Sequence, residues 1–327
     1  MTRRLCTMVV AAGVLLTGCA PSSGPANDPF SGNIAKVQGD VPLPPDAKYE
    51  PANSRPLQSQ DEFVPGTLPP GPGTAADRVP NIVERGRIII GVDPSLNLLA
   101  FRDPNGQLTG FEVGLAREIA RDIFGDPDAV DFRYVNSTER ISALEEGRVD
   151  AVIRTMTVTS DRSQQVGFSA PYLEPSAGLL TTQEASISST ADLGGRRVCV
   201  AFRSTSEDVA RATAPDSTLL LVNNWGDCLV ALQQHQAEAI LGDDFILAGI
   251  KAQDPGTVIV QRDLTAESYA VATGLKDFGL QRQVNATLER IRADGTWQAL
   301  YNQWLGPYLK DGVQPTPNYV AREEAEQ

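Results

Sequence analysis

The chain has 327 residues and a formal net charge of −13. This acidic balance argues against nucleic acid as a partner, because phosphates require a basic surface, and against loose adsorption to anionic lipid. The length is sufficient for one large domain or for two lobes of ~100–150 residues each.

Residues 1–18 have the pattern of an export signal. Arg3 and Arg4 give a positive start, an apolar stretch follows, and Gly18 is the small residue that precedes a cleavage site. The apolar stretch is shorter than the roughly 20 residues that span a membrane. Cys19 directly after this pattern resembles the lipobox of bacterial lipoproteins. The resemblance implies a diacylglycerol and N-acyl lipid on Cys19 and a place on the extracytoplasmic face of the cell membrane; an ordinary secretory signal is the alternative.

Residues 19–79 are rich in Pro, Gly, Ser and Asn. The proline runs at 42–45 and 68–73 are incompatible with the interior of a helix or a sheet. We therefore predict a disordered tether, partly polyproline, between the lipid and the folded part. The polar residues 309–327 are predicted to form a flexible C-terminal tail.

Alternating strands and helices are predicted from residue 80 onward. Residues 88–92 form an apolar run typical of a buried strand, and an amphipathic stripe that begins at Phe111 ends at Gly125. The other elements predicted in this part are a short helix at 82–87, a strand at 130–135, a short helix at 141–147 and a strand at 149–153. This order favours an α/β fold built on a doubly wound parallel sheet.

A second run of the same kind begins near residue 192. We predict strands at 197–201, 218–222 and 237–241, each followed by a helix, at 206–212, 227–234 and 244–252. Two further helices are predicted at 280–291 and 296–304. Cys199 lies on the first of these strands and Cys228 on a later helix. An even pair of cysteines in an exported chain predicts a disulfide, with two buried free thiols as the alternative.

Five segments in this order resemble the bacterial extracellular solute-binding proteins of family 3, which serve polar amino-acid ABC transporters. The likeness is to their glutamate- and glutamine-binding lipoproteins from Gram-positive bacteria in particular. The segments are Gly110-Phe111-Glu112-Val113-Gly114-Leu115, with Gly114 where the family has an acid; the run from Arg148 to Arg162; Phe168-Ser169-Ala170-Pro171-Tyr172; the run from Asp192 to Val198; and the run from Asp294 to Trp304.

This resemblance implies a monomer with a two-lobed, type II periplasmic-binding-protein-like fold. Lobe 1 would comprise residues 80–177 and 271–308, and lobe 2, residues 184–266, would be inserted into it. Two crossovers near 178–182 and 265–269 would act as a hinge, so that the lobes close over a ligand in the cleft.

A free amino acid has an α-carboxylate and an α-ammonium, so its receptor needs a basic and an acidic group. Arg162 stands where the family has its carboxylate-binding arginine, and a guanidinium offers two parallel donors. Thr205 and Ser206 begin a predicted helix whose free N–H groups attract the same anion. Asp243 follows a strand and is our candidate for the ammonium, with Asp244 as a rival. The remaining candidates around the ligand are Thr155 and Thr157.

Three further residues bear on selectivity. Asp93 matches a family aspartate that can accept a hydrogen bond from a side-chain amide. Arg154 or Arg203 could pair with a side-chain carboxylate, whose repulsion from Asp93 they would offset. We therefore predict glutamate or aspartate as ligand, with glutamine or asparagine next. A salt bridge from Arg154 to Asp93 is the alternative for that residue.

The sequence favours a binding protein that delivers its amino acid to an ABC permease. A sensor that signals amino-acid supply to a membrane partner would use the same fold, so the sequence does not separate the two. An enzyme is disfavoured because the predicted cleft contains neither a His nor a Gly-rich phosphate loop. We expect no metal, and no cofactor beyond the lipid on Cys19.

Overall fold

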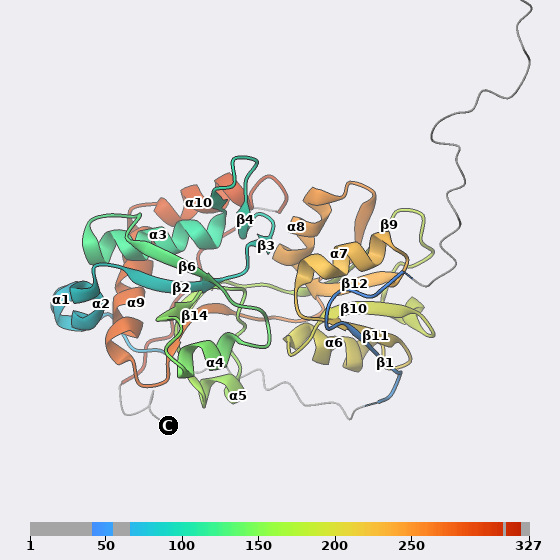
Figure 1. Cartoon of the computed structure of the whole chain (residues 1–327), viewed down its shortest axis with the longest axis horizontal. Helices are drawn as coiled ribbons and strands as arrows, with labels where there is room; N and C mark the ends of the chain where they lie inside the picture. The colour runs from blue at the N-terminus through green and yellow to red at the C-terminus, as the bar shows by residue number, and fades with distance from the viewer. Residues whose placement is uncertain (1–40, 55–65, 310–311, 322–327) are drawn as a thin grey trace, which may run out of the picture. The chain divides into compact units, whose positions relative to one another are not determined.

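A computed structural model describes residues 41–54, 66–309 and 312–321 (Figure 1). The predicted signal peptide and the predicted lipidation site Cys19 lie outside these residues. The described residues from Leu43 onward form one compact unit that contains two lobes, each built on its own sheet.

The first lobe has a five-stranded sheet among the described residues, with the order β6-β2-β7-β14-β8. Its strands are β2 (Ile88–Val92), β6 (Val130–Tyr134), β7 (Ala151–Val152), β8 (Val166–Leu173) and β14 (Tyr269–Gly274). A small separate sheet contains β3 (Ser95–Leu96), β4 (Ala100–Arg102) and β5 (Leu108–Thr109). The helices of this lobe are α1 (Ala75–Arg78), α2 (Pro80–Arg85), α3 (Phe111–Phe124), α4 (Arg140–Glu145), α5 (Ser160–Ser163), α9 (Phe278–Ala293) and α10 (Thr296–Trp304).

The second lobe has a six-stranded sheet, again counted over the described residues, with the order β1-β11-β10-β12-β9-β13. Its strands are β1 (Lys48–Glu50), β9 (Ala177–Thr182), β10 (Arg197–Ala201), β11 (Thr218–Val222), β12 (Ala239–Asp243) and β13 (Thr257–Gln261). Its helices are the 3-10 helix η1 (Thr190–Leu193) and the α-helices α6 (Thr205–Thr213), α7 (Trp225–Gln233) and α8 (Asp244–Gln253).

Successive side chains of a strand point to opposite sides of a sheet, and in both lobes the apolar ones pack on a core on each side. In β2, Ile88 and Ile90 join the core formed with α3, α9 and α10, whereas Ile89 packs on the core that includes α4. In β10, Val198 faces the core on the α6 side and Cys199 faces α7. This alternation places Cys199 beside Cys228 of α7, and the predicted disulfide between them is present.

The two crossovers differ in part from their predicted positions. Residues 178–182 belong to β9, which pairs with β12 and β13 inside the second lobe, so this lobe begins at Ala177 and the first crossover lies at 174–176. The second crossover falls between β13 and β14, at 262–268. The sheets are mixed rather than all parallel, because β9 and β14, the strands that follow the crossovers, run antiparallel to their neighbours.

Parts of the predicted tether are ordered, which corrects that prediction for the described residues. β1 pairs antiparallel with β11, and Leu68 is completely buried. The Thr67 hydroxyl donates to the Phe168 carbonyl oxygen over 2.7 Å and accepts a hydrogen bond from Asn285. Short apolar and hydroxyl side chains between the prolines therefore find partners on the lobes, which proline content alone did not indicate.

The described part of the C-terminal tail also packs on the first lobe, in contrast to the prediction of a flexible tail. Tyr319 bridges to Thr67, and the amide of Gln314 donates to the Leu288 carbonyl oxygen of α9.

Gly114, where the family motif has an acid, faces α10. A Cβ atom on this residue would lie 2.6 Å from the Leu300 side chain. The departure from the motif is thus explained by the close packing of α10 on α3.

Candidate functional site

A narrow cavity lies between the lobes where strand ends and helix starts meet. Its lining comes from both lobes: Ser137, Arg140, Thr155, Thr157, Arg162, Ser204, Thr205, Trp225, Asp243 and Ile246. The volume open to the centre of a water molecule is only about 10 Å³, roughly the space of one water. An amino acid therefore requires the lobes to separate before it can enter.

Two arginines of the first lobe stand side by side in this wall. The Arg162 guanidinium donates to the Thr157 carbonyl oxygen at 2.7 Å and to the Arg203 carbonyl oxygen at 3.1 Å. Arg140 donates to the same Arg203 oxygen at 3.3 Å and to the carbonyl oxygens of Ser137 and Thr155. Across the described part of the chain, neither arginine forms an ion pair with a carboxylate.

The electrostatics of this pair favour an anion. Burial lowers the pKa of Arg140 well below its usual value, and the positive charge of Arg162 lowers it further. Burial also lowers the pKa of Arg162, although the charge of Glu267 partly opposes the shift. Because an arginine remains charged at neutral pH, two desolvated cations face one small space.

The acidic side of the cavity is Asp243, at the end of β12 and the start of α8. Its carboxylate accepts hydrogen bonds from the Tyr269 hydroxyl and, over 3.2 Å, from the Ser206 hydroxyl. Burial, with the nearby charge of Glu267, raises the pKa of Asp243 to about 8. The rival Asp244 does not line this cavity; its carboxylate accepts from its neighbour's N–H, that of Phe245, at 2.9 Å.

Glu267, in the second crossover, joins the two lobes. Its carboxylate accepts from the hydroxyls of Thr157 in the first lobe at 2.7 Å and Thr205 in the second at 2.8 Å. These two hydroxyls are also 3.3 Å apart. Thr155 is held from behind, because its N–H donates to the Glu112 carboxylate at 2.7 Å. The threonines predicted from sequence thus meet at the cavity, and Glu267 connects two of them.

The predicted selectivity residues are placed differently. The Arg154 side chain is fully buried and donates to the Asp93 carboxylate at 2.6 Å and to the Ser137 hydroxyl at 2.9 Å. This is the salt bridge that was the alternative for Arg154, so both charges of the pair are already satisfied. Arg203 is exposed, and its side chain lies over the Phe202 ring. Its backbone carbonyl oxygen, rather than its side chain, contacts the cavity residues Arg140 and Arg162.

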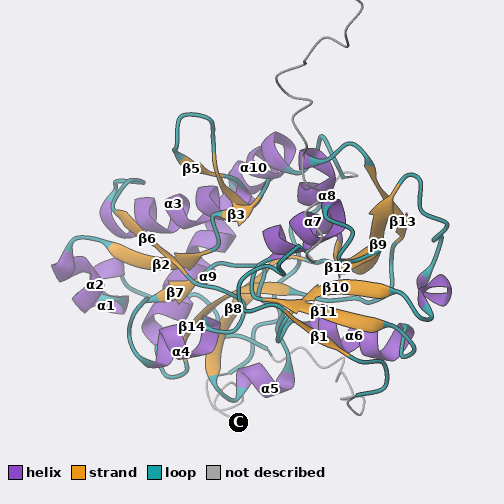
Figure 2. Ribbon diagram, turned by 45° about the vertical axis from the view of Figure 1, so that its right-hand side comes forward, coloured by secondary structure: helices purple, strands orange, loops and turns teal. Residues whose placement is uncertain are grey.

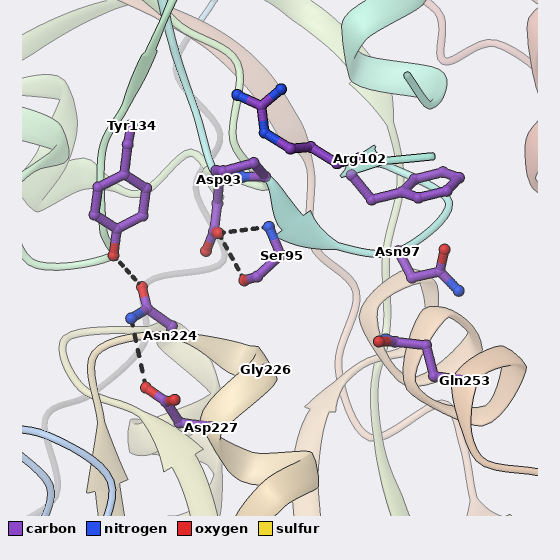
Figure 3. A pocket seen from close by; sticks show the side chains of 11 residues that line it. Asp93, Ser95, Asn97, Arg102, Tyr134, Asn224, Gly226, Asp227 and Gln253 are labelled. Carbon is purple, nitrogen blue, oxygen red and sulfur yellow. Dashed lines mark hydrogen bonds between the residues drawn. The ribbon is translucent and has the colours of Figure 1, made fainter. Parts of the chain in front are cut away.

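A larger cavity opens between the lobes on the side of Asp93 (Figure 3). About 680 Å³ of it is open to the centre of a water molecule. The Tyr134 hydroxyl of the first lobe donates to the Asn224 side chain of the second, which in turn donates to Asp227. The lining is Asp93, Pro94, Ser95, Asn97, Phe101, Arg102, Tyr134, Asn224, Gly226, Asp227 and Gln253.

The sequence prediction missed Arg140, Glu267 and Tyr269. Arg140 begins α4 and is buried together with Ala143 and Leu144. A charged residue on the apolar side of a short helix was therefore a usable signal. Nothing in the sequence marks Glu267, because its role depends on how the crossover brings two threonines together.

No cluster of three or more His, Cys, Asp or Glu side chains suited to a metal is found among the described residues. Within the same residues, none of the helices has the length and apolar character needed to span a membrane.

Comparisons with known proteins agree with this architecture. Residues 88–307 match the model of the bacterial extracellular solute-binding proteins, family 3. The chain is 31% identical over 231 residues to the ABC transporter glutamine-binding protein GlnH of Bacillus subtilis, covering 70% of this chain and 85% of that protein. It is 29% identical over 248 residues to the glutamate-binding protein GluB of Corynebacterium glutamicum, covering 72% and 84%.

A solved structure gives the same picture. The solute receptor for L-cysteine of Neisseria gonorrhoeae aligns with a TM-score of 0.68 and 27% identity, covering 74% of this chain and 98% of that one. The predicted two-lobed, type II periplasmic-binding-protein-like fold is confirmed.

Proposed function

Because the chain belongs to the bacterial extracellular solute-binding proteins of family 3, we propose that it captures an acidic amino acid, glutamate or aspartate, between its lobes and delivers it to an ABC permease. The general function, that of a solute-binding protein for amino acids, follows from the family and from relatives that are transport binding proteins. The identity of the ligand rests on the residues of the site.

The observation that carries this proposal is the pair Arg140 and Arg162 opposite Asp243 in one cavity. An acidic amino acid has two carboxylates and one ammonium, which match two guanidinium groups and one carboxylate. Arg162 would take the α-carboxylate, Asp243 the α-ammonium and Arg140 the side-chain carboxylate, each as a charge-assisted hydrogen bond. A glutamine amide would leave one desolvated guanidinium without an anion, which makes glutamine and asparagine the second choice.

The test is calorimetry with glutamate, aspartate, glutamine and asparagine on the wild type and three variants. Arg162→Ala should raise the Kd of all four by about a hundredfold or more, because it leaves a buried charge pair incomplete. Arg140→Gln should weaken the acids about tenfold more than the amides. Arg102→Gln, which alters the larger cavity, is the matched control and should leave every Kd within about twofold.

Two outcomes would contradict the assignment. Unchanged affinity in Arg162→Ala would remove that residue from the site. Loss of binding in Arg102→Gln with normal binding in Arg140→Gln would move the ligand to the larger cavity.

Transport is favoured over sensing because the relatives named above are called transporter or binding proteins. A sensor for amino-acid supply remains the second candidate function. Co-purification of the membrane partner with the protein distinguishes transport from sensing. A permease should be recovered together with the protein when ligand is present. We propose no catalytic activity and no cofactor apart from the lipid.

A lipid on Cys19 would hold the receptor near its membrane partner at a high effective concentration. We expect Cys19→Ala to move the protein from the membrane fraction to the medium and to leave the Kd for the amino acid unchanged. Retention of the variant on the membrane would disprove the anchor.

A further inference from the structure

The N-terminal strand β1 is held on the second lobe by more than its strand pairing. Its three residues pair with Leu219 to Leu221 of β11 (Figure 2). The Tyr49 hydroxyl donates to the Gln236 carbonyl oxygen at 2.8 Å, and the Lys48 ammonium lies 4.6 Å from the centre of the Phe202 ring. The Glu50 carboxylate accepts from Arg211 at 2.7 Å, with both side chains almost buried.

These contacts continue toward the ligand cavity. The same Arg211 nitrogen donates to Glu207 at 2.8 Å. The other oxygen of that Glu207 carboxylate accepts the backbone N–H of Arg203 at 2.8 Å. A chain of charge-assisted hydrogen bonds therefore runs from β1 through α6 to the loop after β10, and such bonds are roughly twice as strong as neutral ones.

The Arg203 backbone is the point where this chain meets the site. Its φ of +60° lies in the left-handed region, which is unfavourable for a residue with a Cβ and therefore needs support from its surroundings. Its carbonyl oxygen accepts hydrogen bonds from both Arg140 and Arg162. A shift of this one turn would move an acceptor that both guanidinium groups share.

We infer that β1 is a positioning element of the ligand site, with Glu50 acting through Arg211 and Glu207 to fix the Arg203 turn against the two arginines. The inference deepens the proposed function and rests on it for the effect on affinity. On the plainer view, β1 only covers the free edge of the sheet. The two views differ in what loss of the Glu50 charge does at a site that Glu50 does not touch.

The experiment compares Glu50→Gln with Tyr49→Phe in the full-length chain. The control removes another contact of the same strand, the 2.8 Å hydrogen bond from the Tyr49 hydroxyl to the Gln236 carbonyl oxygen, which lies outside the chain from Glu50 to Arg203. Two quantities are measured: the Kd for glutamate, and the rate of backbone amide hydrogen exchange in residues 202–206 without ligand. Glu50→Gln should raise the Kd about tenfold and speed this exchange, as expected for a supporting network, whereas the control should change neither by more than about twofold.

Equal Kd and equal exchange in the two variants would overturn the inference and leave β1 as an edge cover. If the wild type binds none of the four amino acids, the proposed function fails, and the exchange rates alone still decide whether Glu50 fixes the Arg203 turn. Should Glu50→Gln not fold, Glu50→Asp gives the same test, because the shorter side chain draws the carboxylate away from Arg211 and keeps the charge and the strand pairing.

Discussion

Asp243 is buried and has a raised pKa, and the two together should make the affinity for a ligand at this residue depend on pH. It is buried, and burial together with the charge of Glu267 raises its pKa to about 8, so the carboxyl group is mostly protonated at neutral pH. A ligand ammonium favours the ionised form. Binding at this residue must therefore release a proton.

We predict that the Kd for the amino acid falls as the pH rises from 6 to 8 and levels off above 8. The fall is at most about tenfold per pH unit, because one proton is released per ligand. Calorimetry in two buffers of different ionisation enthalpy gives the number of protons directly. Asp244→Asn is the control: burial raises the pKa of Asp244 to about 6, but this residue does not line the cavity, so its loss should leave the dependence up to pH 8 in place. A Kd that does not change between pH 6 and 8 would exclude Asp243 as the ammonium partner.

The same carboxyl group gives the opposite trend for stability without ligand. Its pKa in the folded protein, about 8, lies above the ordinary value of 3.8, so the folded state retains a proton that the unfolded state has lost. The contribution of Asp243 to the free energy of unfolding is therefore present at low pH and is lost as the pH rises from about 4 to about 8.

Individual residues of the site differ in how far sequence could predict them. Arg162 and Asp243 follow from a motif and from a strand end, and both line the cavity. Arg154 carries the same charge as Arg140 and is close to it in sequence, yet its charge is neutralised by Asp93. Which of the two arginines faces the cavity depends on how α4 packs against β7. The pattern of apolar residues in the sequence does not determine this packing.

Elements with apolar periodicity were predictable nearly to the residue, as β2 and α3 show. The segments before residue 80 were not, because their order comes from single contacts rather than from a repeat. Leu68 fills a site in the first lobe, while Tyr49 and Glu50 attach the segment to the second. A three-residue strand has no periodicity that a sequence can display.

These contacts predict that a chain beginning at residue 43 is more stable than one beginning at residue 75. The shorter chain loses the buried Leu68, worth about 2–5 kcal/mol. It also leaves the buried Asn285 amide without its acceptors at Thr67 and Leu68, which costs about 1–3 kcal/mol. For a protein of this size we expect a Tm lower by on the order of 10 °C in thermal unfolding. Equal Tm values would show that the segment contributes nothing to the fold.

At the scale of the whole molecule, further contacts join the lobes around the cavity, besides those of Arg140 and Arg162 with the Arg203 carbonyl oxygen and of Tyr269 with Asp243. Glu267 bridges the threonines of the two lobes, Tyr134 reaches Asn224, and Asn97 donates to the Gly249 carbonyl oxygen at 3.3 Å. A cavity with room for about one water cannot admit an amino acid in this arrangement. Ligand exchange therefore requires these contacts to break and form again as a set.

Gly249 provides the sharpest test of this closure. A Cβ at this position of α8 would lie 2.4 Å from the Asn97 carbonyl oxygen of the other lobe. Gly249→Ala should stabilise α8 itself, since Ala is favoured over Gly in a helix by about 1 kcal/mol, while it prevents the lobes from closing fully.

We predict that Gly249→Ala raises the Kd for the amino acid about tenfold, mainly through faster dissociation, because a lobe that cannot close retains the ligand poorly. The ligand-free Tm should not fall. Stopped-flow dissociation and thermal unfolding measure the two effects separately. Gly194→Ala in the same lobe is the matched control, because no atom lies within 4 Å of the added Cβ. If both alanine variants released the ligand at the wild-type rate, the approach of α8 to Asn97 would not be part of the bound state, and closure would have to depend on Glu267 and its two threonines instead.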